Sequence, residues 1–283
     1  MAYERRLDRN SPGCLLFLVD QSGSMSEPVA GEERSKAEAV AEALNNLLYE
    51  LVIRCIKGES DSPRHYYDVG VIGYGKTVGS GFSGPLAGRE LVSIVDVADN
   101  PLGVVERDAV GAAAGGSDVG TVPRRHKFPV WIEPAASDMT PMSEAFNRAG
   151  AVLAEWVKAH PTSFPPIVIN ISDGAATDGD PRIWARRLSG LSTQDGDLLL
   201  FNLNVSALPA QPLFCPADPS LLDNDYARLL FEMSSLLPPY MVELAAGMGL
   251  DVPRFGRGFV YNADMVAVVR FLQIGTATAQ AMR

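Results

Sequence analysis

The sequence predicts an α/β fold in which a central, mainly parallel sheet carries helices on both faces. Two observations lead to this prediction. Short apolar segments typical of buried strands alternate along the chain with longer segments whose apolar residues recur at helical spacing. The stretches between successive strands are also long enough for the helical crossover that parallel strands require. This alternation is typical of doubly wound α/β folds.

The chain opens with a predicted strand, helix and second strand. Residues 14–19 form an unbroken apolar run, as expected of a strand that is buried on both faces. Residues 35–55 place apolar side chains at helical spacing, with Ser35 as a candidate N-cap. Residues 66–74 form the second predicted strand. This order indicates two parallel strands joined by a right-handed crossover.

The second half of the chain continues the alternation. Helical spacing or helical turns occur at residues 141–160, 181–191, 221–237, 241–248 and 263–274. Strands are predicted at residues 167–171, 198–205 and 258–262. The pattern is looser between residues 75 and 134, where short apolar pieces flank a Gly- and Ala-rich run at 111–120. We interpret this part as an inserted or elongated segment with a mobile tip.

The length and composition fit one large domain. The chain has 283 residues, of which 47% are hydrophobic and 20% charged, so it can bury a sizeable core. We expect a single domain over residues 12–283 that includes the looser segment at about 75–134. Residues 1–11 are expected to form an N-terminal tail.

Charge, hydropathy and cysteine usage limit the partners and the compartment that we expect for this protein. The net charge of -10 argues against nucleic-acid binding, because binding phosphates requires clustered Lys and Arg. We interpret the basic run at 124–127 as a solvated loop. No apolar run approaches the ~18 residues of a membrane span, and the N-terminus lacks the features of a signal peptide. Cys14, Cys55 and Cys215 fit reduced packing residues better than a disulfide framework, so we expect a cytoplasmic protein.

Oxygen-bearing side chains follow the first predicted strand. Asp20 ends the apolar run, and the hydroxyls of Ser22 and Ser24 alternate behind it in a turn. Gly23 is expected to let the backbone bend so that the carboxylate and both hydroxyls face one point. Oxygen-only ligation of this kind suits Mg²⁺, Ca²⁺ or Mn²⁺ rather than zinc.

Two further loops place oxygen ligands next to predicted elements. Thr140 precedes the helix predicted at 141–160, and Asp173 follows the strand predicted at 167–171. In open α/β sheets, ligands bind at the carboxyl ends of the strands, so we expect both residues to lie near Asp20.

Each of these side chains also has a purely structural interpretation. Ser22 and Ser24 could cap the turn, and Thr140 followed by Pro141 matches an N-cap followed by proline at the first helical position. Independent caps would not converge on one edge of the sheet, so the combined pattern favours a metal site.

The three loops resemble the metal-ion-dependent adhesion site (MIDAS) of von Willebrand factor A (vWA) domains. That site has the pattern Asp-x-Ser-x-Ser, a distant Thr and a distant Asp, which here falls on Asp20, Ser22, Ser24, Thr140 and Asp173. The resemblance extends from about residue 12 to the C-terminus. It implies a Rossmann-like vWA fold and a divalent cation, usually Mg²⁺. It also implies that the serines bind the ion directly, and that the aspartates and the threonine bind it directly or through water.

The resemblance also implies a docking function. Mg²⁺ takes six oxygens, so this ligand set leaves a position that an Asp or Glu of a partner protein can fill. Segments such as DQSGSM, DVGVIGYG and FPVWIEP are similar to compact bacterial vWA proteins that accompany a Ser/Thr protein kinase and a metal-dependent protein phosphatase. Those proteins occur in arrangements related to stress, tellurium-resistance-type and phage-conflict systems. The implied function is a non-catalytic scaffold or regulator that docks such a kinase or phosphatase.

Two other functions remain open on the sequence alone. Magnesium-dependent phosphatases of the haloacid-dehalogenase type also begin with an Asp at the end of the first strand. They require a second Asp two positions on, where this chain has Ser22, so the general acid is missing. Cell-surface adhesion conflicts with the unpaired cysteines and with the absence of an export signal.

A second cation site near residues 177–180 is a further alternative. Thr177, Asp178 and Asp180 provide oxygens there, but their spacing lacks the acidic pattern of a calcium loop. We interpret Asp178 as a turn residue with Gly179, and Asp180 as the cap of the helix predicted at 181–191.

Overall fold

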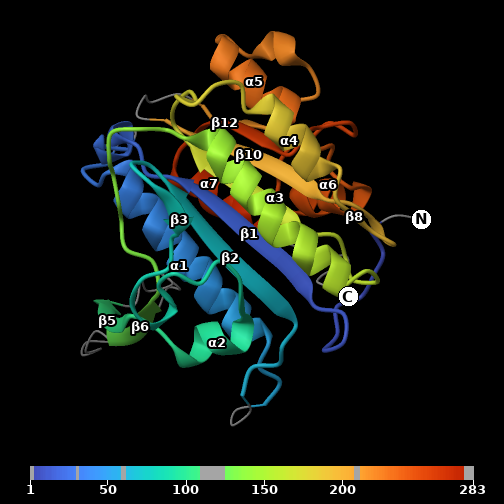
Figure 1. Ribbon diagram of the computed structural model, residues 1–283. Coiled ribbons are helices and arrows are strands. Elements are labelled where there is room, and N and C mark those ends of the chain that lie inside the picture. Colours follow the sequence, from blue (N-terminus) through green and yellow to red (C-terminus); the bar gives the residue numbers. More distant parts are fainter. Residues whose placement is uncertain (1–2, 30–31, 59–61, 109–124, 207–210, 277–283) are drawn as a thin grey trace, which may run out of the picture.

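The computed structural model describes residues 3–29, 32–58, 62–108, 125–206 and 211–276. A twisted sheet crosses the middle of the molecule, and helices lie on both of its faces (Figure 1). The inner strands run parallel to one another. In spatial order they are β12 (Phe259–Ala263), β10 (Leu199–Val205), β7 (Ile167–Ser172), β1 (Gly13–Asp20) and β2 (Tyr67–Tyr74). The predicted α/β fold with a mainly parallel sheet is therefore confirmed.

Short antiparallel strands complete the sheet at its edges. They are β3 (Val78–Ser80) and β4 (Val92–Ser93), which pair with β2, and β11 (Leu213–Phe214), which pairs with β12. Two hairpins lie apart from this sheet, formed by β5 (Gly103–Asp108) with β6 (Arg125–Val130) and by β8 (Ser192–Thr193) with β9 (Gly196–Asp197). None of these strands was predicted individually: β5 and β6 lie in the looser segment at 75–134, and the others have only two or three residues, which carry no readable period.

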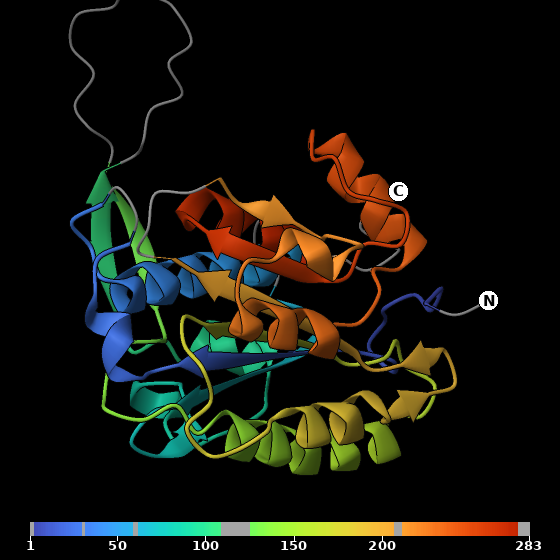
Figure 2. The same cartoon turned by 90° about the horizontal axis from the view of Figure 1, so that it is seen from above.

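The helices form one layer on each face of the sheet. One layer contains α1 (Lys36–Arg54), α2 (Ile94–Asp99), α6 (Pro239–Gly247) and α7 (Met265–Gly275). The other contains α3 (Met142–Ala159), α4 (Arg182–Ser189) and α5 (Asp225–Met233). Figure 2 shows α3 and α4 on the face opposite α1. Short 3-10 helices are found at Gly23–Ser26 (η1), Gly84–Leu86 (η2) and Pro219–Leu221 (η3).

Strand β1 joins the two hydrophobic layers. Its side chains alternate between the faces, so Phe17 packs with the α1 layer and Leu16 with the α3 layer. All eight residues of β1 are buried, which explains why this segment is an unbroken apolar run in the sequence.

The order of the strands reverses at the carboxyl ends of β1 and β7. The chain leaves β1 toward β2 on one side and later returns as β7 on the other side. This reversal is a topological switch point, where open α/β sheets bind their ligands. Asp20 ends β1, and Asp173 follows the last residue of β7.

Most predicted elements are present, with corrections at their ends. Ser35 caps α1 as expected: its side chain accepts from the Glu38 N–H, and the Glu38 carboxylate accepts from the Ser35 N–H. The last predicted helix begins later than expected, because Ala263 still belongs to β12 and Asp264 caps α7. Of the helical region predicted at 221–237, only Asp225–Met233 forms an α-helix.

The looser segment between residues 75 and 134 packs against the main sheet and α1 where the structure describes it. The side chain of Asn45, in α1, accepts from the N–H groups of Trp131 (2.8 Å) and Ile132 (3.1 Å), and it donates to the Ile132 carbonyl (2.9 Å). The Trp131 indole donates to the Val97 carbonyl at 2.6 Å. The predicted mobile tip at 111–120 lies outside the described residues, as does the start of the basic run at 124–127.

Two further expectations concern compartment and membrane. Cys14, Cys55 and Cys215 are buried and free, as expected of packing residues. Within the described ranges, no helix has both the length and the apolar character needed to cross a bilayer.

Replacing Asn45 with Ala should destabilise the fold by about 2–4 kcal/mol, because two buried N–H groups and one carbonyl would lose their partner. Urea unfolding would measure this loss. Asn147→Ala is the matched control, since Asn147 is exposed on α3 and should change stability by less than about 0.5 kcal/mol. Equal stability of the two variants would show that Asn45 does not hold this segment.

Candidate metal centre

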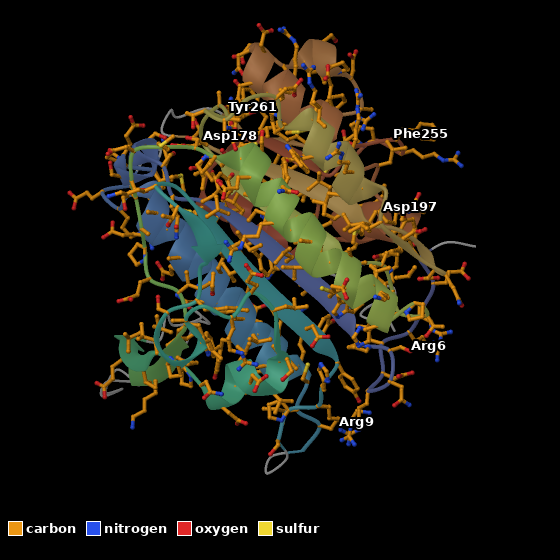
Figure 3. All side chains as sticks on the ribbon, in the orientation of Figure 1. Arg6, Arg9, Asp178, Asp197, Phe255 and Tyr261 are labelled. Atoms are coloured by element: carbon orange, nitrogen blue, oxygen red, sulfur yellow. The ribbon has the colours of Figure 1, made fainter. Side chains whose placement is uncertain are left out.

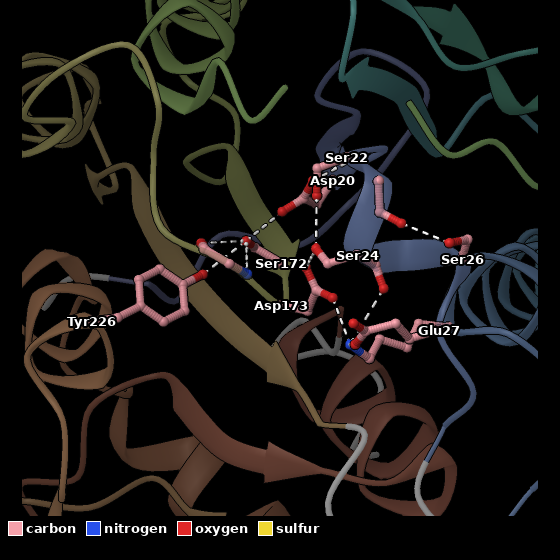
Figure 4. Close-up of polar contacts among 11 residues, drawn as sticks. Asp20, Ser22, Ser24, Ser26, Glu27, Ser172, Asp173 and Tyr226 are labelled. Carbon is pink, nitrogen blue, oxygen red and sulfur yellow. Dashed lines mark hydrogen bonds and ion pairs between the residues drawn. The ribbon is translucent and has the colours of Figure 1, made fainter. Parts of the chain in front are cut away.

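Asp20 lies fully buried at the end of β1 (Figure 4). Its Oδ1 accepts from the Ser22 N–H at 2.8 Å, and its Oδ2 accepts from the Ser172 hydroxyl at 2.6 Å. Burial raises the pKa of Asp20 to about 6, although the hydrogen bonds from Ser172 and Ser22 act in the opposite direction. A cation beside this carboxyl group would favour its charged form.

The hydroxyls of Ser22 and Ser24 lie in the turn that follows Asp20. Their Oγ atoms are 3.1 Å apart, and the Ser24 hydroxyl donates to Asp173 Oδ1 at 2.7 Å. Ser22 precedes η1, but its side chain makes no capping hydrogen bond, so the capping interpretation of Ser22 is wrong. Gly23 does not have a positive φ, so the bend does not depend on the left-handed freedom of glycine.

The loop before α3 lies against this turn. The Ser137 N–H and hydroxyl both donate to the Gln21 carbonyl, at 2.6 and 2.9 Å. Thr140, at the end of the loop, is buried and exchanges two hydrogen bonds with Thr177. The Thr140 N–H donates to Thr177 Oγ1 (3.0 Å), and the Thr177 N–H donates to the Thr140 carbonyl (2.9 Å). The structure thus joins the predicted Thr140 loop to the Asp20 turn.

Asp178 caps α3 in place of Thr140. Its carboxylate accepts from the N–H groups of Ser143 (3.1 Å) and Glu144 (2.9 Å) in the first turn of that helix. Figure 3 shows Asp178 at this end of α3. The capping interpretation of Thr140 is therefore wrong, and Asp178 is a helix cap rather than a simple turn residue. Asp180 lies one residue before the N-cap of α4, which is Pro181, and its Oδ1 accepts from the N–H of Arg182, the first residue of that helix, at 3.0 Å.

Asp173 is paired with a lysine that sequence analysis did not single out. Asp173 Oδ2 accepts from Lys36 Nζ at 2.6 Å, and the same ammonium donates to Glu27 Oε2 (2.9 Å) and to the Ser24 carbonyl (3.4 Å). Lys36 is the first residue of α1, where a cation opposes the helix dipole. That unfavourable position was the signal in the sequence that could have marked Lys36.

The Tyr226 hydroxyl group is linked to Asp20 through Ser172. The Tyr226 hydroxyl, from α5, donates to Ser172 Oγ at 2.7 Å, and Ser172 in turn bonds Asp20. Burial raises the pKa of Tyr226 well above its usual value, so this phenol stays a neutral donor. Tyr226 lies far from the motif in sequence, and no local pattern pointed to it.

The spacing of the oxygens fits a small divalent ion. Neighbouring ligands of octahedral Mg²⁺ lie about 3.0 Å apart, because each is about 2.1 Å from the ion. The Ser22–Ser24 and Ser24–Asp173 oxygen separations of 3.1 and 2.7 Å are close to this value. Among the described residues, no three His, Cys, Asp or Glu side chains form a group able to hold a metal. An ion here would therefore depend on hydroxyl ligands as well as the two aspartates.

Comparison with known proteins does not establish a family. No protein-family model matches the chain, and no curated protein matches it. Solved structures show weak likeness. The pilus adhesin SpaC from Lactobacillus rhamnosus GG is 14% identical with a TM-score of 0.45, over 93% of this chain and 30% of the adhesin.

Two further solved structures are less alike. The adhesive tip pilin GBS104 from Group B Streptococcus agalactiae is 15% identical, with a TM-score of 0.29 over 59% of this chain and 46% of that chain. The human COPII-coat protein Sec24c is 12% identical, with a TM-score of 0.31 over 70% of this chain and 26% of that chain. The chain thus spans less than half the length of each of these proteins, and likeness at this level assigns no function.

The raised pKa of Asp20 predicts a pH-dependent stability in metal-free buffer. A carboxyl group with a pKa of about 6 in the fold and 3.8 ordinarily favours folding when protonated. This contribution is complete below pH 3.8 and is lost as the pH rises through 6, which amounts to about 3 kcal/mol. Urea unfolding between pH 4 and 7 should show this loss in wild type relative to Asp20→Asn. Parallel curves for the two proteins would contradict the prediction.

Proposed function

We propose that this protein is a vWA-type module that docks a partner protein through a divalent cation. The ligands are Asp20, Ser22, Ser24, Thr140 and Asp173, and the ion is Mg²⁺, with Ca²⁺ or Mn²⁺ as alternatives. The observation that carries the proposal is the hydrogen bond between Ser24 and Asp173, which joins residues 149 positions apart at the switch point of the sheet.

The chemistry of the site supports docking of a carboxylate. Two carboxylates do no more than neutralise a divalent ion, three hydroxyls add no further negative charge, and Mg²⁺ retains exchangeable positions. An Asp or Glu of the partner can take such a position. The ion thereby offers a positive contact on a chain whose net charge of -10 would otherwise repel acidic partners.

The partner that we propose is a Ser/Thr protein kinase or a metal-dependent protein phosphatase, and the role is that of a scaffold or regulator. This step rests on the similarity of the motifs to bacterial vWA proteins. We propose no catalytic activity, because Ser22 bonds Ser24 where a haloacid-dehalogenase-type phosphatase needs an acid. The three buried free thiols support a cytoplasmic location.

Ser24→Ala should weaken Mg²⁺ binding by at least about tenfold, because it removes a ligand that also bonds Asp173. Ser26→Ala is the matched control. Ser26 belongs to the same short helix, is exposed and donates to the Gly23 carbonyl at 2.7 Å, outside the ligand set. Calorimetric titration with Mg²⁺ measures both. Ser26→Ala should bind Mg²⁺ as wild type does. If Ser24→Ala does so too, the proposed ligands do not form a metal site.

Binding of the partner should require both the ion and Ser24. Immobilised wild type is expected to retain a kinase or phosphatase from native lysate in Mg²⁺ and to release it in a chelator. Immobilised Ser24→Ala should retain no kinase or phosphatase in either condition. Substituting the exposed acidic residues of the recovered enzyme one by one should then abolish binding at a single position. Retention in chelator, or by Ser24→Ala, would contradict metal-dependent docking.

A further inference from the structure

A buried ammonium group lies beside the proposed metal ligands. The side chain of Lys36 is 5% exposed, and its Nζ has three oxygen neighbours from two parts of the chain. These are Asp173 Oδ2 after β7, Glu27 Oε2 after η1 and the Ser24 carbonyl within η1. Oxygens from separate segments that surround one cation are the arrangement expected of a cation site, and here the cation belongs to the chain itself.

The ammonium stays charged in this position. Two carboxylate oxygens, Asp173 Oδ2 at 2.6 Å and Glu27 Oε2 at 2.9 Å, favour the charged form of the amine. The first turn of a helix is an unfavourable place for a cation, so the favourable contacts come from these oxygens rather than from α1. Lys36 thus balances the charge of a buried carboxylate.

We propose that Lys36 is a built-in counter-cation that competes with the divalent ion for Asp173 and so sets the ion affinity of the site. The inference rests on the proposed metal site. Asp173 Oδ1 accepts from Ser24 and Oδ2 accepts from Lys36, so each of its oxygens already accepts one hydrogen bond. An ion that binds Asp173 must either displace the ammonium or lie close to it, and the repulsion between the two charges weakens binding.

Glu27 provides the place to which the ammonium can move. Its side chain is 57% exposed, and it already accepts from Lys36 Nζ at 2.9 Å. When an ion takes Asp173, Lys36 keeps Glu27 and the Ser24 carbonyl as acceptors, so it needs no new partner. The ion affinity therefore depends on the balance between two carboxylates that share one lysine.

This exchange predicts opposite effects for two substitutions. Lys36→Gln removes the competing charge but keeps a hydrogen-bond donor for Asp173, so Mg²⁺ affinity should rise by at least about tenfold. Glu27→Gln leaves the ammonium with Asp173 as its one carboxylate, so Mg²⁺ affinity should fall. Lys36→Met is a second charge-removing variant, which should bind Mg²⁺ more tightly and melt at a lower temperature without metal.

The controls are Lys158→Gln and Glu155→Gln. These residues form an exposed pair at 3.9 Å on α3, with side chains 79% and 80% exposed, and their substitution changes the net charge in the same way. Their Mg²⁺ affinities should match wild type. Calorimetry at fixed ionic strength measures Mg²⁺ binding in each protein, and the paramagnetic resonance signal of free Mn²⁺ provides a second readout of ion binding.

The outcomes separate this inference from the proposed function. Tighter binding in Lys36→Gln and weaker binding in Glu27→Gln, with both controls unchanged, supports the competition. If wild type binds Mg²⁺ and Lys36→Gln binds it equally or more weakly, the inference is wrong while the metal site stands. If neither wild type nor Lys36→Gln binds an ion, the metal site itself is wrong and the competition falls with it.

Discussion

The parallel pairing of β1 with β7 is the constraint on which the rest of the site depends. The register places Val19 beside Ile171, so the two strands end together at Asp20 and Ser172. Strands β2 and β7 lie on opposite sides of β1, so the order of the strands reverses at this edge. The turn after Asp20, the segment after Ser172 and the loop before α3 are then neighbours, although more than a hundred residues separate the first two.

Charge compensation at this edge of the sheet is uneven between the two aspartates. Asp173 has the Lys36 ammonium at 2.6 Å, whereas the hydrogen bonds that the structure describes for Asp20 come from neutral donors, Ser22 and Ser172. Burial raises the pKa of Asp20 for that reason, and it does so even though both hydrogen bonds favour the charged form. One compensated and one uncompensated carboxylate are the basis of our proposal that a further cation binds here in competition with Lys36.

Local patterns predicted the long elements of the fold and failed for the short ones. Strand β1 and helix α1 are readable because a buried strand is apolar throughout and an amphipathic helix repeats every 3.6 residues. Strands β3 and β11 have no such signature, since their pairing with β2 and β12 creates them. The end of β12 was predicted one residue too early for the same reason, because pairing decides it. Ala263 pairs with Val205 of β10 and so remains a strand residue.

The sequence by itself determined the candidate ligands and the edge on which they meet. Asp20 and Asp173 each follow an apolar run, and buried parallel strands end at a common edge. Only the tertiary structure decided which side chains form hydrogen bonds and ion pairs around these candidate ligands. Lys36 pairs with Asp173, Tyr226 supports Ser172, and Asp178 caps α3 in place of Thr140. Such partners come from distant segments, and hydrogen bonds and ion pairs depend on distances within a few ångströms that no periodicity in the sequence encodes.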